Sequence, residues 1–446
     1  MKSTFNIYCD ECCHKEKLTH TDFLQDHDSS VYLTILPLKS KLNCTMLEEL
    51  FEIQVRISSQ IPSKFRRFLF EQINWDARCI GIIGARGVGK TTLVLQYFKE
   101  NFSSPEECLY FSADHVLVAG IGLYNIARHF FALGGSTIII DEIHKYPSWG
   151  QELKNIIDSY PEKRVIFTGS SSLHILKQQA DLSRRAVTYT LPGLSFREYL
   201  AITGLYETDA VSFYQIIKEH VAIAAGIASK FPVLKAFREY LNHGYYPFFM
   251  EGVGDYMNKL ANAIEKVFYE DIPAVWNIKP GNIVNLKRLT WLIASSQPFI
   301  PNIDKLSREL RISKEYIYIY LEALEKAGIT RALFLKQKGF RSVRKPSKIY
   351  LNNPNLYKLF TGKEGMAPEK GAVREAFFIS QAGERYHVYL ASKGDFLVGD
   401  YLIEMGGTWK SFNQVKDAGE RGFLFLDDRE IGAGRKIPLY LAGLLY

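Results

Sequence analysis

The sequence predicts an α/β fold in which a parallel sheet carries a phosphate-binding loop, followed by helical segments and a small α+β domain. Short apolar runs alternate with helix-like segments between residues 79 and 191, as in sheets that helices cover on both faces. A glycine-rich turn directly follows the first run, and two acidic residues follow a later one. Near residue 400, two further apolar runs flank the turn dipeptide Gly399-Asp400.

Composition sets the broad class of protein. A chain of 446 residues is long enough for about two to four domains. Its 47% hydrophobic, 23% charged and 13% aromatic residues are typical of a globular protein and exclude a disordered one. The net charge of +7 permits a nucleic-acid partner without requiring it. No apolar run reaches transmembrane length and no signal-peptide region is visible, so we expect a cytoplasmic protein without a membrane partner.

Residues 1–45 are expected to form a weakly ordered leader, and Met46 is an alternative native start because the helical pattern begins there. Four residues of the leader have the spacing of a metal-binding knuckle. Only Cys44 follows nearby, so no second pair completes a tetrahedral zinc site, and we favour a leader without metal. The knuckle residues are Cys9, Cys12, Cys13 and His14.

Residues 46–75 predict two helices ahead of the first strand. We interpret the basic run Lys64, Arg66 and Arg67 as a solvated helix face rather than as ligand contacts. Cys79 and Cys108 lie in apolar, strand-like runs and are predicted to be buried free thiols.

The turn after the first strand matches the phosphate-binding pattern G-x-x-x-x-G-K-[ST] in full. Its glycines let backbone N–H groups surround an anion, and the following helix presents its positive end. Lys90 is expected to reach the β- and γ-phosphates, and Thr91 to offer a hydroxyl to Mg²⁺. The predicted ATP-binding residues here are Gly84, Ala85, Arg86, Gly87, Val88, Gly89, Lys90, Thr91 and Thr92.

Behind this loop, the pattern predicts a helix over 90–101, a strand over 108–112, a helix over 122–133 and a strand over 136–142. The last strand is fully apolar until it ends in two carboxylates, as expected of a central parallel strand. Asp141 is therefore predicted to bind Mg²⁺ together with Thr91, and Glu142 to polarise the attacking water as a catalytic residue.

A helix over 148–160 and a strand over 164–171 follow. Because parallel strands end at one edge of a sheet, Thr168 and Ser170 are expected beside the loop, where they would sense the γ-phosphate. Arg184 or Arg185, ahead of a strand over 186–191, is a candidate to reach that phosphate in cis or from a neighbouring subunit. A structural salt bridge is the equal alternative for each arginine.

Together, these residues resemble AAA-type P-loop ATPases, and more closely a prokaryotic group that joins this module to a restriction-endonuclease-like domain. The resemblance covers about 46–446 and implies an AAA-type domain over 46–200, ATP and Mg²⁺ binding, slow hydrolysis and an unassigned function. Its marks are Gly-Ala-Arg-Gly-Val-Gly-Lys-Thr, Ile-Ile-Ile-Asp-Glu-Ile-His, Phe-Thr-Gly-Ser-Ser, Asp-Leu-Ser-Arg-Arg and Leu-Pro-Gly-Leu-Ser-Phe-Arg-Glu-Tyr-Leu.

Residues 201–300 predict a helical lid or connector, in which Gly244-Tyr-Tyr-Pro247 is expected to pack near the nucleotide edge. Residues 301–352 resemble a winged helix-turn-helix, with Ser313 as an N-cap. Its wing carries basic side chains suited to DNA phosphates, whereas acidic residues on the second helix oppose base readout; an interdomain connector is the equal alternative. The basic residues are Lys336, Lys338, Arg341, Arg344, Lys345 and Lys348, and the acidic ones are Glu315, Glu322 and Glu325.

The tail, 353–446, is predicted to be the endonuclease-like domain. A two-residue turn at Gly399-Asp400 would place Asp395 opposite Glu404, and this pair of like charges needs a metal or a lysine to compensate it. The pair resembles the D-x(n)-E-x-K core of restriction-type nucleases, which implies Glu375 as a further acid in a second metal site. The lysine position of that core is Gly406 here, and the nearest substitute is Lys410, so nuclease activity is doubtful.

We therefore expect an ATP-binding protein with Mg²⁺-dependent hydrolysis, coupled to conformational change and to a candidate DNA, protein or oligomeric partner. One alternative is a nucleotide-gated DNA- or protein-binding switch without turnover. The other is an ATP-regulated nuclease.

Overall fold

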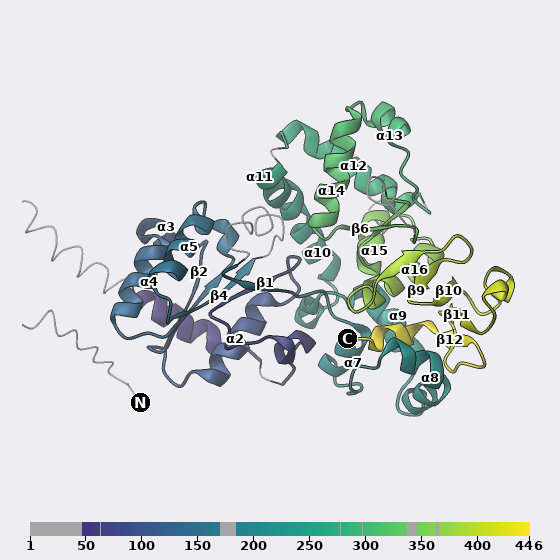
Figure 1. Cartoon of the computed structure of the whole chain (residues 1–446), viewed down its shortest axis with the longest axis horizontal. Helices are drawn as coiled ribbons and strands as arrows, with labels where there is room; N and C mark the ends of the chain where they lie inside the picture. The colour runs from purple at the N-terminus through teal and green to yellow at the C-terminus, as the bar shows by residue number, and fades with distance from the viewer. Residues whose placement is uncertain are drawn as a thin grey trace, which may run out of the picture. The chain divides into compact units, whose positions relative to one another are not determined.

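In the computed structural model, a five-stranded parallel sheet is formed by residues 79–190 (Figure 1). The structure describes residues 47–62, 64–169, 184–276, 278–296, 298–336, 346–362 and 365–446. The strand order β2-β3-β4-β1-β5 places the strand before the phosphate-binding loop between two neighbours. This sheet confirms the predicted parallel α/β fold. Its strands are β1 (Cys79–Ile83), β2 (Cys108–Ser112), β3 (Thr137–Asp141), β4 (Arg164–Gly169) and β5 (Val187–Thr190).

Alternate strand residues face opposite sides of this sheet, as the period of two requires. Ile80 and Ile82 pack with residues of the helix after the loop, whereas Cys79 and Ile83 pack with the helices of the other face. Cys79 is a buried free thiol, as is Cys108, and burial raises the pKa of Cys79 to about 12. The flanking helices are α2 (Lys90–Asn101), α3 (Val116–Ile121), α4 (Leu123–Ala132), η3 (Ile143–Lys145) and α5 (Trp149–Ser159).

The segment ahead of β1 contains one α-helix, over 47–59, and the 3₁₀-helix η2 (Phe68–Gln72). Both predicted helical stretches are therefore present. The residues before 47, including the cysteines of the predicted leader, lie outside the described part of the chain.

Helices dominate the next segment, as the sequence predicts for 201–300. No single helix among the described residues is both long and apolar enough to cross a membrane. The helices α8 (Phe213–Ala228) and α9 (Val233–His243) reach that length and apolarity only together, and the chain bends by 96° between them. The helices are α7 (Phe196–Ile202), α8 (Phe213–Ala228), α9 (Val233–His243), η4 (Pro247–Glu251), α10 (Tyr256–Lys266), the π-helix η5 (Val267–Asp271), α11 (Ile272–Trp276) and α12 (Pro280–Ser295).

Two helices and a β-hairpin follow, in the order expected for 301–352. The Ser313 hydroxyl accepts from the backbone N–H of Tyr316 at 3.4 Å, which confirms the predicted N-cap. Ile317, Leu321 and Leu324 are buried, as the helical period predicts. The elements are α13 (Ile303–Leu310), α14 (Lys314–Lys326), and the antiparallel strands β6 (Thr330–Leu333) and β7 (Lys348–Leu351).

The carboxyl-terminal part forms a small α+β unit around a mixed sheet of order β12-β11-β10-β9-β8. Val398 pairs with Tyr401 across Gly399 and Asp400, so the predicted hairpin register is confirmed. Gly399 has φ +61°, a conformation that favours glycine in the turn. The elements are α15 (Pro354–Gly362), α16 (Lys370–Ala382), β8 (Val388–Leu390), β9 (Phe396–Val398), β10 (Tyr401–Gly406), η7 (Phe412–Gln414), η8 (Lys416–Arg421), β11 (Gly422–Leu426), β12 (Lys436–Pro438) and η9 (Leu439–Leu444).

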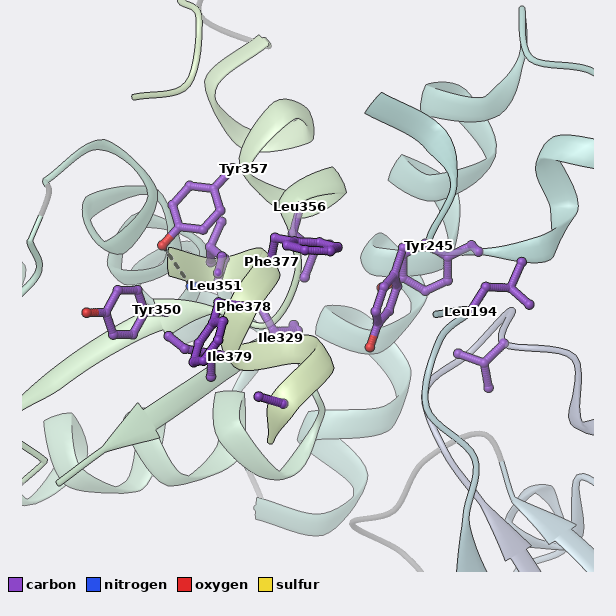
Figure 2. Packing of buried hydrophobic residues seen from close by; sticks show 14 of the residues in the cluster. Leu194, Tyr245, Ile329, Tyr350, Leu351, Leu356, Tyr357, Phe377, Phe378 and Ile379 are labelled. Atoms are coloured by element: carbon purple, nitrogen blue, oxygen red, sulfur yellow. Dashed lines mark hydrogen bonds between the residues drawn. The ribbon is translucent and has the colours of Figure 1, made fainter. Parts of the chain in front are cut away.

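One hydrophobic cluster joins the sheet face under α2 to the helices and the mixed sheet. Figure 2 shows part of it, with Leu194 and Tyr245 on one side and Tyr357 on the other, where the Tyr357 hydroxyl accepts from the Leu351 N–H at 3.1 Å. These elements therefore share buried side chains.

Candidate nucleotide site

The loop after β1 has the backbone that anion binding requires. Gly87 and Gly89 have φ +84° and +95°, where other residues are strained. At Gly84, a Cβ atom would lie 2.3 Å from the main-chain oxygen of Leu191, so a side chain there would collide with the residue after β5. These glycines are therefore needed for the shape of the loop, and the helix α2 begins directly behind it.

Two neighbouring segments keep this loop in place. The buried Arg67 guanidinium donates to the main-chain oxygen of Val88 at 2.5 Å, and to those of Pro192 and Gly193 at 2.8 and 2.9 Å. It also pairs with Glu198 at 2.9 Å. The interpretation of Arg67 as part of a solvated face is therefore wrong, because the basic run gives no sign of the distant carbonyl groups that Arg67 meets.

The outer side of the loop is covered by η4. A Cβ atom on Gly87 would lie 2.9 Å from the Phe248 ring, and the Pro247 ring lies 3.5 Å from the equivalent position of Gly89. Pro247 therefore packs beside the nucleotide edge, as the sequence predicts.

Lys90 is buried, and its ammonium group donates to the main-chain oxygens of Gly84 at 3.0 Å and Ala85 at 2.9 Å. Burial lowers the pKa of Lys90 to about 8, against the opposing effect of Glu142 and Asp141. The lysine contacts neutral carbonyl groups in the loop, so its charge is available to an anionic ligand.

Asp141, at the end of β3, is surrounded by hydroxyl groups from three other elements. One carboxylate oxygen accepts from Thr91 at 2.8 Å and from the Tyr110 hydroxyl at 2.9 Å, and the other accepts from Thr168. A buried carboxylate and an adjacent threonine hydroxyl at a helix N-terminus are oxygen ligands of the kind that Mg²⁺ prefers. The residues present thus fit this metal, and Tyr110 is a contact that its apolar strand did not indicate.

Glu142 has φ +50° and ψ +40°, the left-handed conformation that non-glycine residues rarely adopt. Its backbone N–H donates to the Thr168 hydroxyl at 3.0 Å, which fixes the turn. Burial, and then the charge of Asp141, raise the pKa of the Glu142 carboxyl. Strained backbone of this kind is concentrated at functional sites, and the raised pKa suits a proton acceptor.

Of the other predicted phosphate contacts, Thr168 lies at the site and Arg185 does not. Thr168 lies at the edge that carries the loop, whereas Ser170 lies outside the described residues. Arg185 lies just before β5, which runs parallel to β1 and begins beside Ile80. This arginine is therefore at the amino edge of the sheet, opposite the carboxyl edge that carries the phosphate-binding loop. There it binds Asp158 at 2.7 and 3.0 Å, and Arg184 beside it is exposed. This position does not support contact with a γ-phosphate in cis.

Arg86 is the arginine found beside the site. Its guanidinium lies 3.0 Å from the buried carboxylate of Asp271, in η5, and 3.5 Å from Glu270. The partner is 185 residues away along the chain. Asp271 has no local motif around it, so sequence reasoning had no signal for this contact.

The carboxyl-terminal acids occupy a second cluster. Glu404 is fully buried and pairs with Lys410, and the Gln414 amide, oriented to donate, lies 2.9 and 2.8 Å from its two oxygens. Glu375 accepts from the Tyr350 hydroxyl at 2.6 Å, and burial and the nearby Asp395 raise its pKa to about 7.

This second cluster departs from the expected metal site. Within the described residues, no three or more His, Cys, Asp or Glu side chains are grouped so that they could hold a metal ion. This geometry gives no support to joint metal binding by Asp395, Glu404 and Glu375, which therefore stays a prediction. Lys410 is the cation that compensates the opposed pair, the alternative that the sequence left open.

The basic wing is described only at its ends. The Lys336 side chain is exposed and donates to the Gly399 main-chain oxygen at 3.4 Å. Burial raises the pKa of Glu375, Asp395 and Glu404, and the nearby charge of Lys348 partly opposes this rise in each. The candidate DNA contacts Lys338, Arg341, Arg344 and Lys345 lie outside the described residues.

Comparison with known proteins supports the nucleotide site. Residues 76–200 match the model of an AAA domain, and residues 234–366 match a domain of unknown function. An uncharacterized protein of Methanocaldococcus jannaschii is 26% identical over 282 residues, which are 60% of this chain and 59% of that protein. The chain thus matches about three fifths of the length of this relative.

Solved structures give remote similarities. A Walker-type ATPase of Pyrococcus abyssi is 11% identical, over 68% of this chain and 99% of that one, with a TM-score of 0.37. AMPPCP-bound DnaA from Aquifex aeolicus is 14% identical, over 58% and 85%, with a TM-score of 0.24. The AAA-type domain assignment therefore depends on the sequence match and on the loop and sheet geometry described above.

Proposed function

We propose that this chain binds ATP at the loop of residues 84–92 and hydrolyses it with Mg²⁺. The observation that carries this proposal is the 2.8 Å hydrogen bond between the Thr91 hydroxyl and Asp141. It joins the helix behind the loop to the acidic end of β3, where a metal-bound triphosphate would lie. The AAA-domain match over residues 76–200 supports the same function.

In this proposal, the backbone N–H groups of the loop and Lys90 bind the β- and γ-phosphates. Thr91 and Asp141 would hold Mg²⁺, which when bound neutralises phosphate charge. Glu142 orients the attacking water and takes its proton, and Thr168 keeps the two acidic residues in position through its hydroxyl. An Arg184 or Arg185 contact from a neighbouring subunit stays a prediction.

The test is ATP turnover in Glu142→Gln. This variant keeps the shape of the side chain and removes the proton acceptor, so we expect unchanged ATP binding and hydrolysis that is slower by about 100-fold or more. Glu162→Gln is the matched control, because Glu162 is exposed just before β4, at the opposite edge of the sheet. Equal turnover in the two variants would remove Glu142 from its proposed role.

We also propose that the later segments couple ATP turnover to conformational change and to DNA. Conformational coupling is supported by the shared hydrophobic cluster and by the contact of η4 with the loop. DNA binding through the wing is supported by the exposed Lys336 and the basic sequence around it. We expect DNA to stimulate hydrolysis in the full chain, with the effect lost at high salt. If DNA does not change ATP turnover, the ATP-binding domain and the later segments act independently. Nucleotide binding without turnover would favour the nucleotide-gated binding switch.

The second candidate function is an ATP-regulated nuclease, and the pairing of Lys410 with Glu404 favours it. This lysine supplies the cation that the motif lacks at Gly406. Plasmid cleavage with Mg²⁺ or Mn²⁺ that Asp395→Ala abolishes would support this function. Asp400→Ala, an exposed change in the same hairpin, is the control. An intact plasmid under both metals would end the nuclease proposal.

A further inference from the structure

The phosphate-binding loop carries a cation that is held by a distant carboxylate. Arg86 lies between the loop glycines, and its side chain is 15% exposed. Asp271, at the end of the π-helix η5, is 3% exposed and lies 3.0 Å from the Arg86 guanidinium. Arg86 therefore joins the nucleotide loop to the helical segment through an ion pair with a buried carboxylate.

This ion pair is incompletely satisfied. The Nε atom of Arg86 and the second carboxylate oxygen of Asp271 are buried, and neither has a hydrogen-bond partner among the described residues. A buried charge pair repays its desolvation only when its remaining hydrogen bonds are made. The unused donor of Arg86 is thus available to an oxyanion, and a phosphate can accept it in a bidentate contact.

The charges around Arg86 also favour an exchange of partners. Arg86 belongs to the same phosphate-binding loop as Lys90, and both Lys90 and Glu142 are close enough to feel the charge of its guanidinium. On the other side, Glu270 contacts Arg86 at 3.5 Å and Lys145 at 2.7 Å. Lys145 lies three residues after Glu142, in η3. The two acids of η5 thus contact both the loop and the segment after Glu142.

The form of η5 is consistent with a moving part. A π-helix is rare and is often found at functional sites, because its wider turn is less stable than an α-helix. It lies between α10 and α11, within the segment that packs against the loop.

We propose that Asp271 is a positioning residue that holds Arg86 in the absence of a triphosphate and releases it when the γ-phosphate takes over the guanidinium. Loss of the Arg86 contact then loosens η5 and signals the nucleotide state to the helical segment. This inference rests on the proposed ATP site and adds a residue and a role to it.

The first experiment compares the affinities for ADP and for a non-hydrolysable ATP analogue in the full chain. Asp271→Asn removes the competing charge, so we expect the preference for the triphosphate to increase by about tenfold. Arg86→Ala should reduce that preference by a similar factor. Glu265→Gln is the matched control, because Glu265 lies in α10 and pairs with Lys287 rather than with the loop; it should leave the preference unchanged.

The second experiment needs no variant, in case Asp271→Asn does not fold. Hydrogen exchange over residues 267–276 should become faster with the ATP analogue and stay unchanged with ADP. Equal exchange with both nucleotides, or equal preferences in the variants, would overturn the exchange of partners and leave the ATP site intact. Failure of the unaltered chain to bind any nucleotide would overturn the ATP site as well.

Discussion

The two acidic clusters of this molecule handle buried charge in different ways. On the parallel sheet, Asp141 receives hydrogen bonds from neutral hydroxyl groups, and Lys90 donates to neutral carbonyls. On the mixed sheet, the fully buried Glu404 is paired directly with Lys410. The first cluster therefore keeps its charges for a ligand, whereas the second neutralises its own. This difference indicates that the first is the better candidate for chemistry on a highly charged substrate.

The largest expected effect is on ATP hydrolysis, in a variant of Lys90 in the first cluster. Lys90→Met removes a cation that, among the described residues, donates to main-chain carbonyls and not to a carboxylate, so we expect hydrolysis to fall by about 1,000-fold. The free energy of unfolding should fall by no more than about 1 kcal/mol, because exchanging a buried charge for a hydrophobic side chain is neutral or stabilising. ATP turnover and thermal unfolding measure the two quantities. A large loss of stability would contradict our view that Lys90 is kept for a ligand.

The same change in the second cluster should have the opposite outcome. Lys410→Met leaves the buried Glu404 without its cation, so we expect the free energy of unfolding to fall by about 3 kcal/mol, the low end for such pairs because Lys410 is one-third exposed. Urea unfolding checks this value. The double variant Lys410→Met with Glu404→Gln should recover most of the loss. If Lys410→Met lowered ATP turnover and left stability unchanged, the second cluster would take part in the chemistry of the first.

The smallest effect concerns pH. The pKa of Glu375 is raised from 4.5 to about 7, so between these values the folded chain holds a proton that the unfolded chain releases. The free energy of unfolding should therefore decrease as pH rises through this window, by up to about 3 kcal/mol. Glu375→Gln should reduce this slope, as measured by denaturant unfolding at each pH, and the slope that is left is expected from Asp395 and Glu404, whose pKa values burial also raises. A parent and variant with parallel profiles would contradict the raised pKa.

Lys90 should give the opposite slope in a higher window. Its pKa is lowered from 10.5 to about 8, so the folded chain binds fewer protons than the unfolded one between these values. Stability from this group is therefore gained as pH rises above 8. The same unfolding series in Lys90→Met provides the matched comparison.

Local patterns predicted most of the parallel sheet. The strands β1 and β3 and the loop between β1 and α2 could be predicted closely, because apolar runs and glycines act over a few residues. The hairpin register at Val398 and Tyr401 was also predictable, since a two-residue turn fixes it. The predicted role of Arg185 at the γ-phosphate in cis loses support, because residues ahead of a parallel strand lie at its amino edge.

Contacts between distant segments could not be predicted. Asp271 lies in a stretch with no motif, and its importance depends on the partner that the fold brings to it. Lys410, by contrast, lies near Glu404 in the sequence and could be named as the nearest substitute lysine. Arg67 differs in that its charge was noticed but its burial was not, because three of its partners are main-chain oxygens, which no sequence pattern reveals.

The buried Arg67 has a consequence for the rate of nucleotide capture. Because its guanidinium is bonded to Val88 and to the residues after β5, the loop has its curved backbone before any nucleotide arrives. Little conformational entropy is then left to lose on association. The association rate of nucleotides should accordingly be fast and weakly temperature-dependent. Differences in affinity among nucleotides should come mainly from their dissociation rates.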